Sequence, residues 1–129
     1  MQDPGLSWQG EVIAMDDEAR GTIERFHEAF NRRDLGALGD LITDDCVFEA
    51  TSPAPDGTRH VGREAVLEAW RVFFTDSPAS HFEVEEMFGA GDRVIVRWLY
   101  SWAGGHVRGA DLVRVRDGRV AESLAYVKG

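Results

Sequence analysis

Cysteine is almost absent from this chain, since Cys46 is the only one in 129 residues. No disulfide can form within the chain, which is typical of proteins kept in a reducing compartment, and we expect a cytoplasmic location. Long apolar runs are also missing, and the N-terminus lacks the basic start and apolar stretch of a secretion signal. We therefore expect neither a membrane span nor a membrane partner.

Basic residues are scarce, because 14 Lys and Arg stand against 23 Asp and Glu, giving a formal charge of −9. Binding to the phosphate backbone of nucleic acid requires surplus basic side chains, so a nucleic-acid partner is disfavoured. The four histidines do not pair at metal-ligand spacing and there is no cysteine cluster, which disfavours a metal site. A glycine-rich phosphate loop is missing too, and we expect no cofactor.

The chain does have enough apolar material for one core, with 43% hydrophobic and 10% aromatic residues. Residues 1–15 show no clear period and contain Pro4, Gly5 and Gly10, a pattern that predicts an extended N-terminal arm. Residues 16–129 contain no repeat and no internal boundary, and we expect them to form one domain.

Helical patterns come first in this domain. Residues 16–34 begin with Asp16 or Asp17 as a helix cap and carry Ile23, Phe26 and Phe30 on one stripe. Two further helices are predicted at 34–42 and 63–74. Between them lie a short strand, 44–51, and a loop with two prolines, 52–62.

Strand patterns fill the rest of the chain. Alternating apolar residues, separated by short turns, predict four antiparallel strands at 80–88, 93–102, 106–116 and 119–127. Helices that precede strands in this way indicate an α+β fold, in which the helices cover one face of a curved sheet.

Asp111 is the only charged residue on one face of this predicted sheet. If Gly104 and Gly105 form a two-residue turn, Trp98 stands opposite Asp111 and Tyr100 opposite Gly109. Because strand side chains alternate, the rest of the face is apolar or aromatic. Its other members are Val94, Val96, Trp98, Tyr100, Trp102, Val107, Gly109, Val113 and Val115. We infer that Asp111 points inward, where burial raises a carboxyl pKa and marks a candidate functional group; a core carboxyl that merely accepts a hydrogen bond is the alternative.

Four segments carry a family resemblance by their order and spacing: RFHEAFNRRDLGALGDLITDDCVFEA, GREAVLEAWRVFF, GDRVIVRW and VRGADLVRVRDGRVAESLAYVKG. Over residues 16–129 the chain resembles the SnoaL-like group of the nuclear transport factor 2-like superfamily. The resemblance implies a cone-shaped sheet around a pocket that three N-terminal helices close. Relatives include polyketide cyclases, ketosteroid isomerases, limonene epoxide hydrolase and scytalone dehydratase, so the fold alone does not give the chemistry.

The resemblance carries over unevenly to individual residues. Asp111 stands where ketosteroid isomerase has its protonated Asp, but Phe26 replaces the Tyr and Ala50 the proton-shuttling Asp, which disfavours that mechanism. Arg97 stands at the Arg of the Arg-x-Asp pair of the epoxide hydrolase. Leu99 stands at its Asp, so that carboxylate is absent here. The cyclases use an Asp as acid or base in a largely apolar pocket, a role that fits Asp111.

Other candidates have weaker support. Tyr100 brings a hydroxyl that would orient a ligand carbonyl beside Asp111. His81 opens a strand near the catalytic His of the dehydratase-like relatives, although a histidine there is more often a surface residue. Trp98, Trp102, Phe26, Phe30, Trp70 and His60 are predicted to line the pocket, with plain core packing or a surface position as the alternative.

The opposite face of the sheet is predicted to mediate association. Ile95, Leu99, Ala110 and Leu112 lie on it between arginines, and relatives often dimerise through this face. We expect a symmetric homodimer.

Two functions follow from these residues. One is a cofactor-independent enzyme that cyclises, isomerises, dehydrates or hydrates an apolar polyketide- or terpenoid-like molecule, with Asp111 as acid or base and Tyr100 and His81 assisting. The other is a module of the same fold that binds a small apolar ligand, or only dimerises, without catalysis.

Overall fold

The computed structural model describes residues 14–129, which form three helices and six strands; the helices and five of the strands are those that the sequence predicts. The arm expected over residues 1–15 lies outside the described residues, apart from its last two positions. There, Met15 forms an isolated β-bridge with Gly91. Within residues 14–129, no helix combines the length and the apolar character needed to cross a membrane. The cytoplasmic location stays a prediction.

Helix α2 (Asp17–Arg32) buries the apolar stripe that the sequence shows, including Ile23 and Phe26. Asp16 holds the N-cap position, but its side chain makes no capping hydrogen bond, so the predicted cap is correct in position only. The helix ends at Arg33, whose left-handed backbone (φ 57°) turns its N–H back onto the last carbonyls.

Two shorter helices complete the helical layer. Helix α3 (Leu35–Asp40) starts at Asp34, whose carboxylate accepts a hydrogen bond from the Ala37 backbone N–H at 3.0 Å. Helix α4 (Arg63–Asp76) follows the connection after the first strand. Its buried side consists of Val66, Trp70 and Phe74.

The sheet contains six strands in the order β2-β1-β6-β5-β4-β3. They are β1 (Ile42–Glu49), β2 (Arg59–Val61), β3 (His81–Ala90), β4 (Arg93–Trp102), β5 (Gly105–Arg116) and β6 (Arg119–Val127). The last four form the predicted antiparallel meander, and β1 joins β6 in parallel. Strand β2 corrects the prediction of a loop at 52–62: three residues are too few for a periodic signal, and they pair only because β1 offers an edge.

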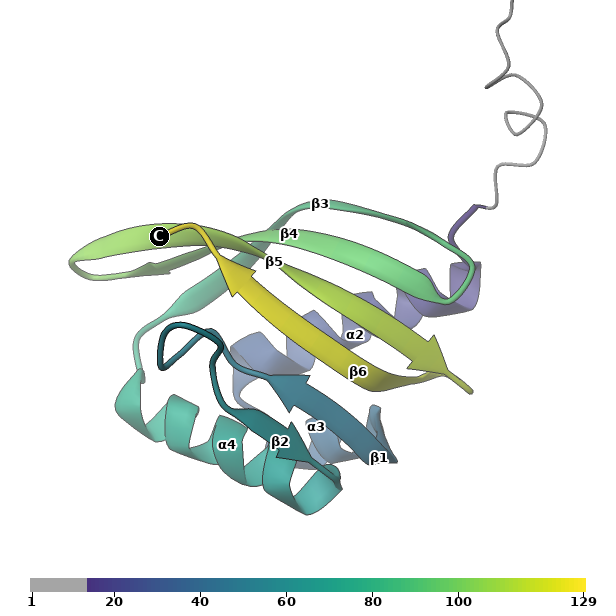
Figure 1. Cartoon of the computed structure of the whole chain (residues 1–129), viewed down its shortest axis with the longest axis horizontal. Helices are drawn as coiled ribbons and strands as arrows, with labels where there is room; N and C mark the ends of the chain where they lie inside the picture. The colour runs from purple at the N-terminus through teal and green to yellow at the C-terminus, as the bar shows by residue number, and fades with distance from the viewer. Residues whose placement is uncertain (1–13) are drawn as a thin grey trace, which may run out of the picture.

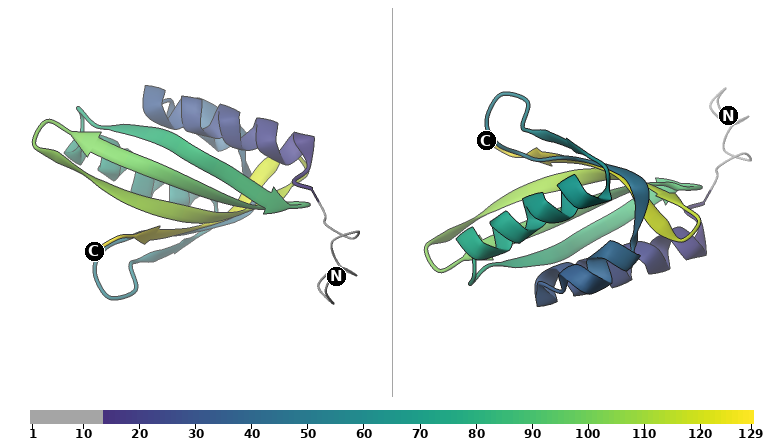
Figure 2. Two further views of the ribbon diagram at one scale, coloured as in Figure 1. Left: turned by 90° about the horizontal axis from the view of Figure 1, so that it is seen from above. Right: turned by 90° about the horizontal axis from the view of Figure 1, so that it is seen from below.

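The sheet curves over the helical layer, which covers one of its faces (Figures 1 and 2). Irregular pairing interrupts the ladders between Val84 and Glu86 on β3 and between Arg114 and Val115 on β5. Such bulges bend a strand and increase its twist. The curvature therefore leaves space between the sheet and the helices. In a flat sheet, helix side chains would pack directly against the strands.

Helix α2 is tied to the edge strand β3 by one side chain. Asn31 donates from Nδ2 to the Phe82 carbonyl at 2.8 Å, and its Oδ1 accepts from the Phe82 N–H at 2.9 Å. This pair imitates the pairing of another strand and satisfies the backbone of β3 at that point. Arg33 adds hydrogen bonds to the carbonyls of Ser77 and Ser80, at 2.7 and 2.9 Å. The helical layer is thus held at a fixed distance from the sheet edge.

The β4–β5 hairpin corrects the predicted register. Its turn is Ala103–Gly104, with Trp102 paired to Gly105, so Trp98 lies opposite Gly109 and not opposite Asp111. The shift is two residues along β5, which leaves the alternation of faces unchanged and keeps Asp111 inward. Packing sets the register: a Cβ at position 109 would lie 2.4 Å from the Trp98 ring and 2.3 Å from the Tyr126 carbonyl. Only a glycine leaves room for the indole there.

Gly109→Ala is expected to lower the free energy of unfolding by about 2 kcal/mol or more, because neither the buried indole nor the neighbouring backbone can move away cheaply. Urea denaturation measures the change. Gly105→Ala on the same strand is the matched control, since its new Cβ would meet the Trp102 ring only at 3.5 Å. Equal losses in the two variants would contradict this account of the register.

Candidate functional site

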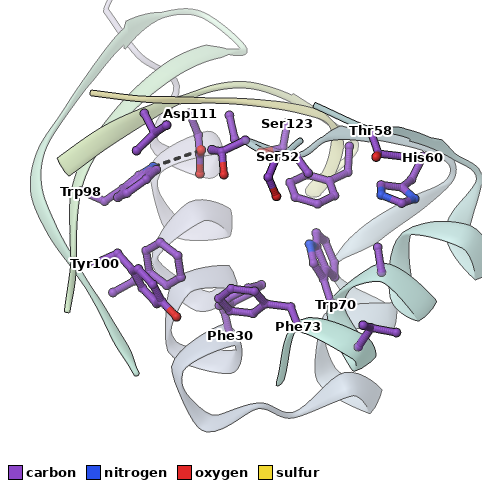
Figure 3. A pocket seen from close by; sticks show the side chains of 18 of the residues that line it. Phe30, Ser52, Thr58, His60, Trp70, Phe73, Trp98, Tyr100, Asp111 and Ser123 are labelled. Atoms are coloured by element: carbon purple, nitrogen blue, oxygen red, sulfur yellow. Dashed lines mark hydrogen bonds between the residues drawn. The ribbon is translucent and has the colours of Figure 1, made fainter. Parts of the chain in front are cut away.

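A cavity of about 760 Å³ lies between the curved sheet and helices α2 and α4 (Figure 3). Aromatic side chains are the largest group in its walls: Phe26, Phe30, Phe48, Trp70, Phe73, Phe82, Trp98, Tyr100 and Trp102. The polar side chains among its lining residues are few: His27, Thr51, Ser52, Thr58, His60, Glu68, Asp111 and Ser123. Such a site suits a small, largely apolar molecule oriented by a few polar contacts.

Asp111 reaches this cavity from β5, as the sequence predicts. Its Oδ1 accepts a hydrogen bond from Trp98 Nε1 at 3.0 Å, while Oδ2 has no hydrogen-bond partner among residues 14–129 (Figure 3). Burial raises the pKa of the carboxyl to about 7, and the Trp98 hydrogen bond opposes this rise. Near neutral pH, the group can therefore give up or take up a proton toward the cavity.

Tyr100 lines the cavity but is not placed beside Asp111. Asp111 pairs with Val96 in the sheet, four residues from Tyr100 along β4, which corresponds to about 13 Å of strand. The Tyr100 ring packs on Phe82 with centroids 4.5 Å apart, and its hydroxyl is on the end away from Asp111 (Figure 3). The hydrogen-bond partner of Asp111 is thus the indole N–H of Trp98 and not the hydroxyl of Tyr100.

His81 does not reach the cavity. It opens β3, pairs with Ser101, has an exposed side chain and is not one of the lining residues. The catalytic role predicted for His81 therefore has no support in the geometry, because the chain places it on the outer surface. His60 does line the cavity, with its ring stacked on Phe48 at a centroid distance of 5.9 Å.

The predicted wall residues all lie on the cavity. Phe26, Phe30 and Trp70 come from the helices, and their rings are in mutual contact at centroid distances of 5.3 to 6.2 Å. Trp98 and Trp102 come from β4, and Trp102 is 44% exposed at the end of the strand. The buried Trp98 is therefore part of the cavity wall, and Trp102 lies at the rim of the cavity.

Of these eight polar lining residues, only Asp111 and His60 were assigned to the pocket from the sequence, and Ser123 and His27 are two of the six that were not. Ser123 on β6 is 5% exposed and shares the inward face with Ala125, the partner of Asp111. Alternation along the last strand would have found it. His27 lies on helix α2. Burial lowers its pKa to about 4, so it is neutral at pH 7, and its Nδ1 has no partner among the described residues.

Residues placed by family resemblance give a mixed result. Ala50 stands where ketosteroid isomerase has its proton-shuttling Asp, and it lines the cavity. The cavity therefore has no carboxylate at that position. Arg97 lies on the outer face, where it pairs with Glu86 at 2.9 Å, and it cannot act on a ligand in the cavity. Cys46 is fully buried, and burial raises the pKa of its thiol to about 12, which makes it a poor nucleophile. Within residues 14–129, no three His, Cys, Asp or Glu side chains gather as metal ligands would.

Comparison with known proteins agrees with this architecture. Residues 23–123 match the SnoaL-like domain. The chain belongs to the SnoaL-like family. No curated protein matches it.

Solved structures similar to this SnoaL-like protein include a protein of unknown function, a candidate polyketide cyclase and a candidate ketosteroid isomerase. An NTF2-like protein of unknown function from Mesorhizobium loti is 45% identical over 91% of this chain and 100% of its own, with a TM-score of 0.79. IdmH from Streptomyces antibioticus, a candidate polyketide cyclase, is 27% identical over 85% of this chain and 91% of its own, with a TM-score of 0.71. A candidate ketosteroid isomerase from Kribbella flavida shares the fold at 18% identity, over 88% and 79% of the two chains, with a TM-score of 0.74.

The raised pKa of Asp111 makes the stability of this SnoaL-like protein depend on pH. The folded state holds the proton up to about pH 7, whereas the unfolded carboxyl loses it near 3.8. The contribution of this group to stability should therefore fall as pH rises from 4 to 8, by an amount on the order of 3–4 kcal/mol. Asp111→Asn should lack this component of the fall.

Urea unfolding of the wild type and of Asp111→Asn at a series of pH values measures the difference, and ¹³C NMR of the carboxyl gives the pKa directly. Asp76→Asn, at an exposed position, should follow the wild type. Because His27 is present in all three proteins, its opposite contribution between pH 4 and 6.5 cancels in the comparison. Parallel curves for the wild type and Asp111→Asn would show that the carboxyl is hydrated.

Proposed function

We propose that this protein is a cofactor-independent enzyme that moves protons on a neutral, apolar small molecule, with Asp111 as acid and base. The observation that carries the proposal is the position of Asp111: one oxygen is bound to Trp98, the other is free toward an aromatic cavity, and the pKa is about 7. A general acid or base works best when its pKa lies near the working pH.

The proposed first step is proton abstraction next to a carbonyl. The ionised Oδ2 of Asp111 takes a proton from the carbon beside the carbonyl, and the electron pair of the C–H bond moves through that carbon to the carbonyl oxygen, which gives an enolate. Return of the proton to another carbon completes an isomerisation. Attack of the enolate carbon on a second carbonyl carbon closes a ring, and the resulting alkoxide takes the proton back from Asp111. Loss of a neighbouring hydroxyl as water, or its reverse, is open to the same pair of proton transfers.

Trp98 is proposed to position the carboxyl and keep its ionised form accessible. The indole N–H stabilises the negative charge on Oδ1, which opposes the effect of burial on the pKa. Without it, Asp111 would remain protonated to higher pH and could serve as an acid but less readily as a base.

The lining of the cavity favours a neutral substrate. Its charged residues are Asp111 and Glu68, and no Lys or Arg is among the lining residues. Glu68 is exposed and is held by Arg71 through two hydrogen bonds, of 2.9 and 2.6 Å. A carboxylate or phosphate ligand would lose its hydration without gaining a cation, which is unfavourable. Flat aromatic walls and the likeness to IdmH support a polyketide-like molecule, with a terpenoid as the other candidate.

A non-catalytic binding module is the second candidate, and one observation favours it. The cavity offers no carboxylate other than Asp111 and the surface-paired Glu68, so a second carboxyl group that could act as acid or base is not provided. Turnover is what distinguishes the two functions.

The test uses exchange of protons for deuterium beside the carbonyl of 1-tetralone, a flat neutral ketone, in D₂O. The wild type should accelerate the exchange, and Asp111→Asn should lower the protein-dependent rate by about 100-fold or more while tetralone still binds, because the amide cannot take the proton. NMR follows the loss of the signal. Trp98→Phe should move the pH dependence of the rate upward.

The matched control is Asp76→Asn, which removes an exposed carboxylate and should exchange tetralone as the wild type does. Equal exchange by the wild type and Asp111→Asn would exclude the role of Asp111. Binding of tetralone without any acceleration would favour the binding module.

We also propose that the outer face of the sheet forms a symmetric homodimer. An apolar row crosses four strands there, since Phe88 pairs with Ile95, Ile95 with Leu112, and Leu112 with Leu124. Phe88 is 48% exposed, and none of the four side chains lines the cavity on the face that the helices cover. Ile95, Leu112 and Leu124 are half-buried. A continuous apolar row that is only partly buried commonly marks a contact surface.

Sedimentation should show a dimer for the wild type and a monomer for Phe88→Glu and Leu112→Glu, because each places two uncompensated carboxylates in a two-fold contact. Ala79→Glu adds the same charge at an exposed loop position and should remain dimeric. A monomeric wild type at micromolar concentration would contradict the proposal.

A further inference from the structure

Trp70 is a buried tryptophan in the middle of helix α4. It is 3% exposed, and its ring contacts Phe26, Phe30 and Phe48 at centroid distances of 5.3, 5.8 and 5.5 Å. These contacts account for a large aromatic side chain at this position. They do not account for an indole, because none of the three rings accepts a conventional hydrogen bond.

The indole N–H of Trp70 has no acceptor among residues 14–129. Its nitrogen is nevertheless not one of the polar atoms that lack a hydrogen-bond partner and are also completely inaccessible. Trp70 lines the cavity, and Figure 3 shows its nitrogen on the edge of the ring that is turned toward the open space. Buried Trp N–H groups usually find a partner, since an unmet donor costs free energy. The donor is therefore left available to whatever occupies the cavity.

The other cavity tryptophan that is fully buried shows the contrast. Trp98 is 4% exposed, and its N–H donates a hydrogen bond to Asp111 within the protein. Trp70 comes from the helical layer and Asp111 from the sheet, so the two polar groups face the cavity from different walls (Figure 3). A ligand that spans the cavity meets a proton-transfer group on one wall and a fixed N–H donor on another.

We propose that Trp70 Nε1–H donates a hydrogen bond to a neutral oxygen of the ligand, a carbonyl or an ether, and so selects and orients ligands that carry such an acceptor. The proposal rests on the cavity being the ligand site of the proposed function. An indole N–H has no formal charge, which suits a cavity without Lys or Arg in its lining. Hydrocarbons of the same shape would fill the cavity but leave the donor unmet.

The test compares 1-tetralone with tetralin, which has the same ring skeleton without the oxygen. ¹⁵N-labelled protein gives one indole N–H signal for each of its four tryptophans, and through-bond NMR assigns that of Trp70 without any variant. The titration is made at pH 8.5, where Asp111 is mainly ionised and cannot donate to the carbonyl. Tetralone should move the Trp70 N–H proton downfield, and tetralin should not.

Affinity gives the second readout. The wild type should prefer tetralone over tetralin, and Trp70→Phe should reduce this preference about fivefold, the effect of one neutral hydrogen bond. The ratio corrects for lost packing, because both ligands lose it equally. An equal shift of the Trp70 signal with both ligands, an unchanged ratio in Trp70→Phe, or failure of tetralone to bind would overturn the proposal. Neither readout depends on turnover, so an equal shift or an unchanged ratio with bound tetralone is separate from a failure of the Asp111 chemistry.

Discussion

The hydrogen bond from Trp98 to Asp111 is the interaction on which the character of the cavity depends. It forms because position 109 has no side chain, so the indole can lie against β5 and extend its N–H to the carboxyl two residues further along the strand. The bond occupies one carboxyl oxygen and leaves the other to the cavity. Burial and this hydrogen bond act on the pKa of Asp111 in opposite directions, and their balance leaves that pKa at about 7.

The space around Asp111 exists because the sheet curves and the helices are held off its surface. Bulges bend the strands, and Asn31 and Arg33 tie α2 to the edge of the sheet and the loop before it. Phe30 then joins the layers, since its ring contacts Phe74 on α4 at 4.8 Å and Phe82 on β3 at 5.4 Å. An aromatic wall of this kind is stiff, so the cavity is expected to keep its shape when empty.

Charge is distributed so that the cavity has no cation while the outer face carries several. Arg97, Arg108 and Arg114 pair with acids of β3 and of the β3–β4 turn. These exposed pairs contribute little to stability. Their placement follows from strand alternation, because residues next to inward positions must face outward. The same alternation that buries Asp111 therefore keeps the arginines away from it, which is the basis for proposing a neutral ligand.

Much of the fold was predictable, because helix and strand periodicity are local. The helices, the four-strand meander and the inward position of Asp111 follow from patterns of a few residues each. The family resemblance added the cone and its pocket. What failed depended on partners distant in sequence: β2 pairs because β1 lies beside it, and the hairpin register follows from the fit of Trp98 over Gly109.

The site divides in the same way. The sequence by itself determined that a carboxyl would face an aromatic interior, since alternation along one strand fixes which side each residue takes. Only the tertiary structure decided which groups meet it. Trp98 became the partner of Asp111, Tyr100 lies four residues too far along its strand, and His81 faces outward at the strand end. The available N–H of Trp70 also emerged there. Contacts between strands and helices depend on register and packing across the whole chain, and no local pattern encodes them.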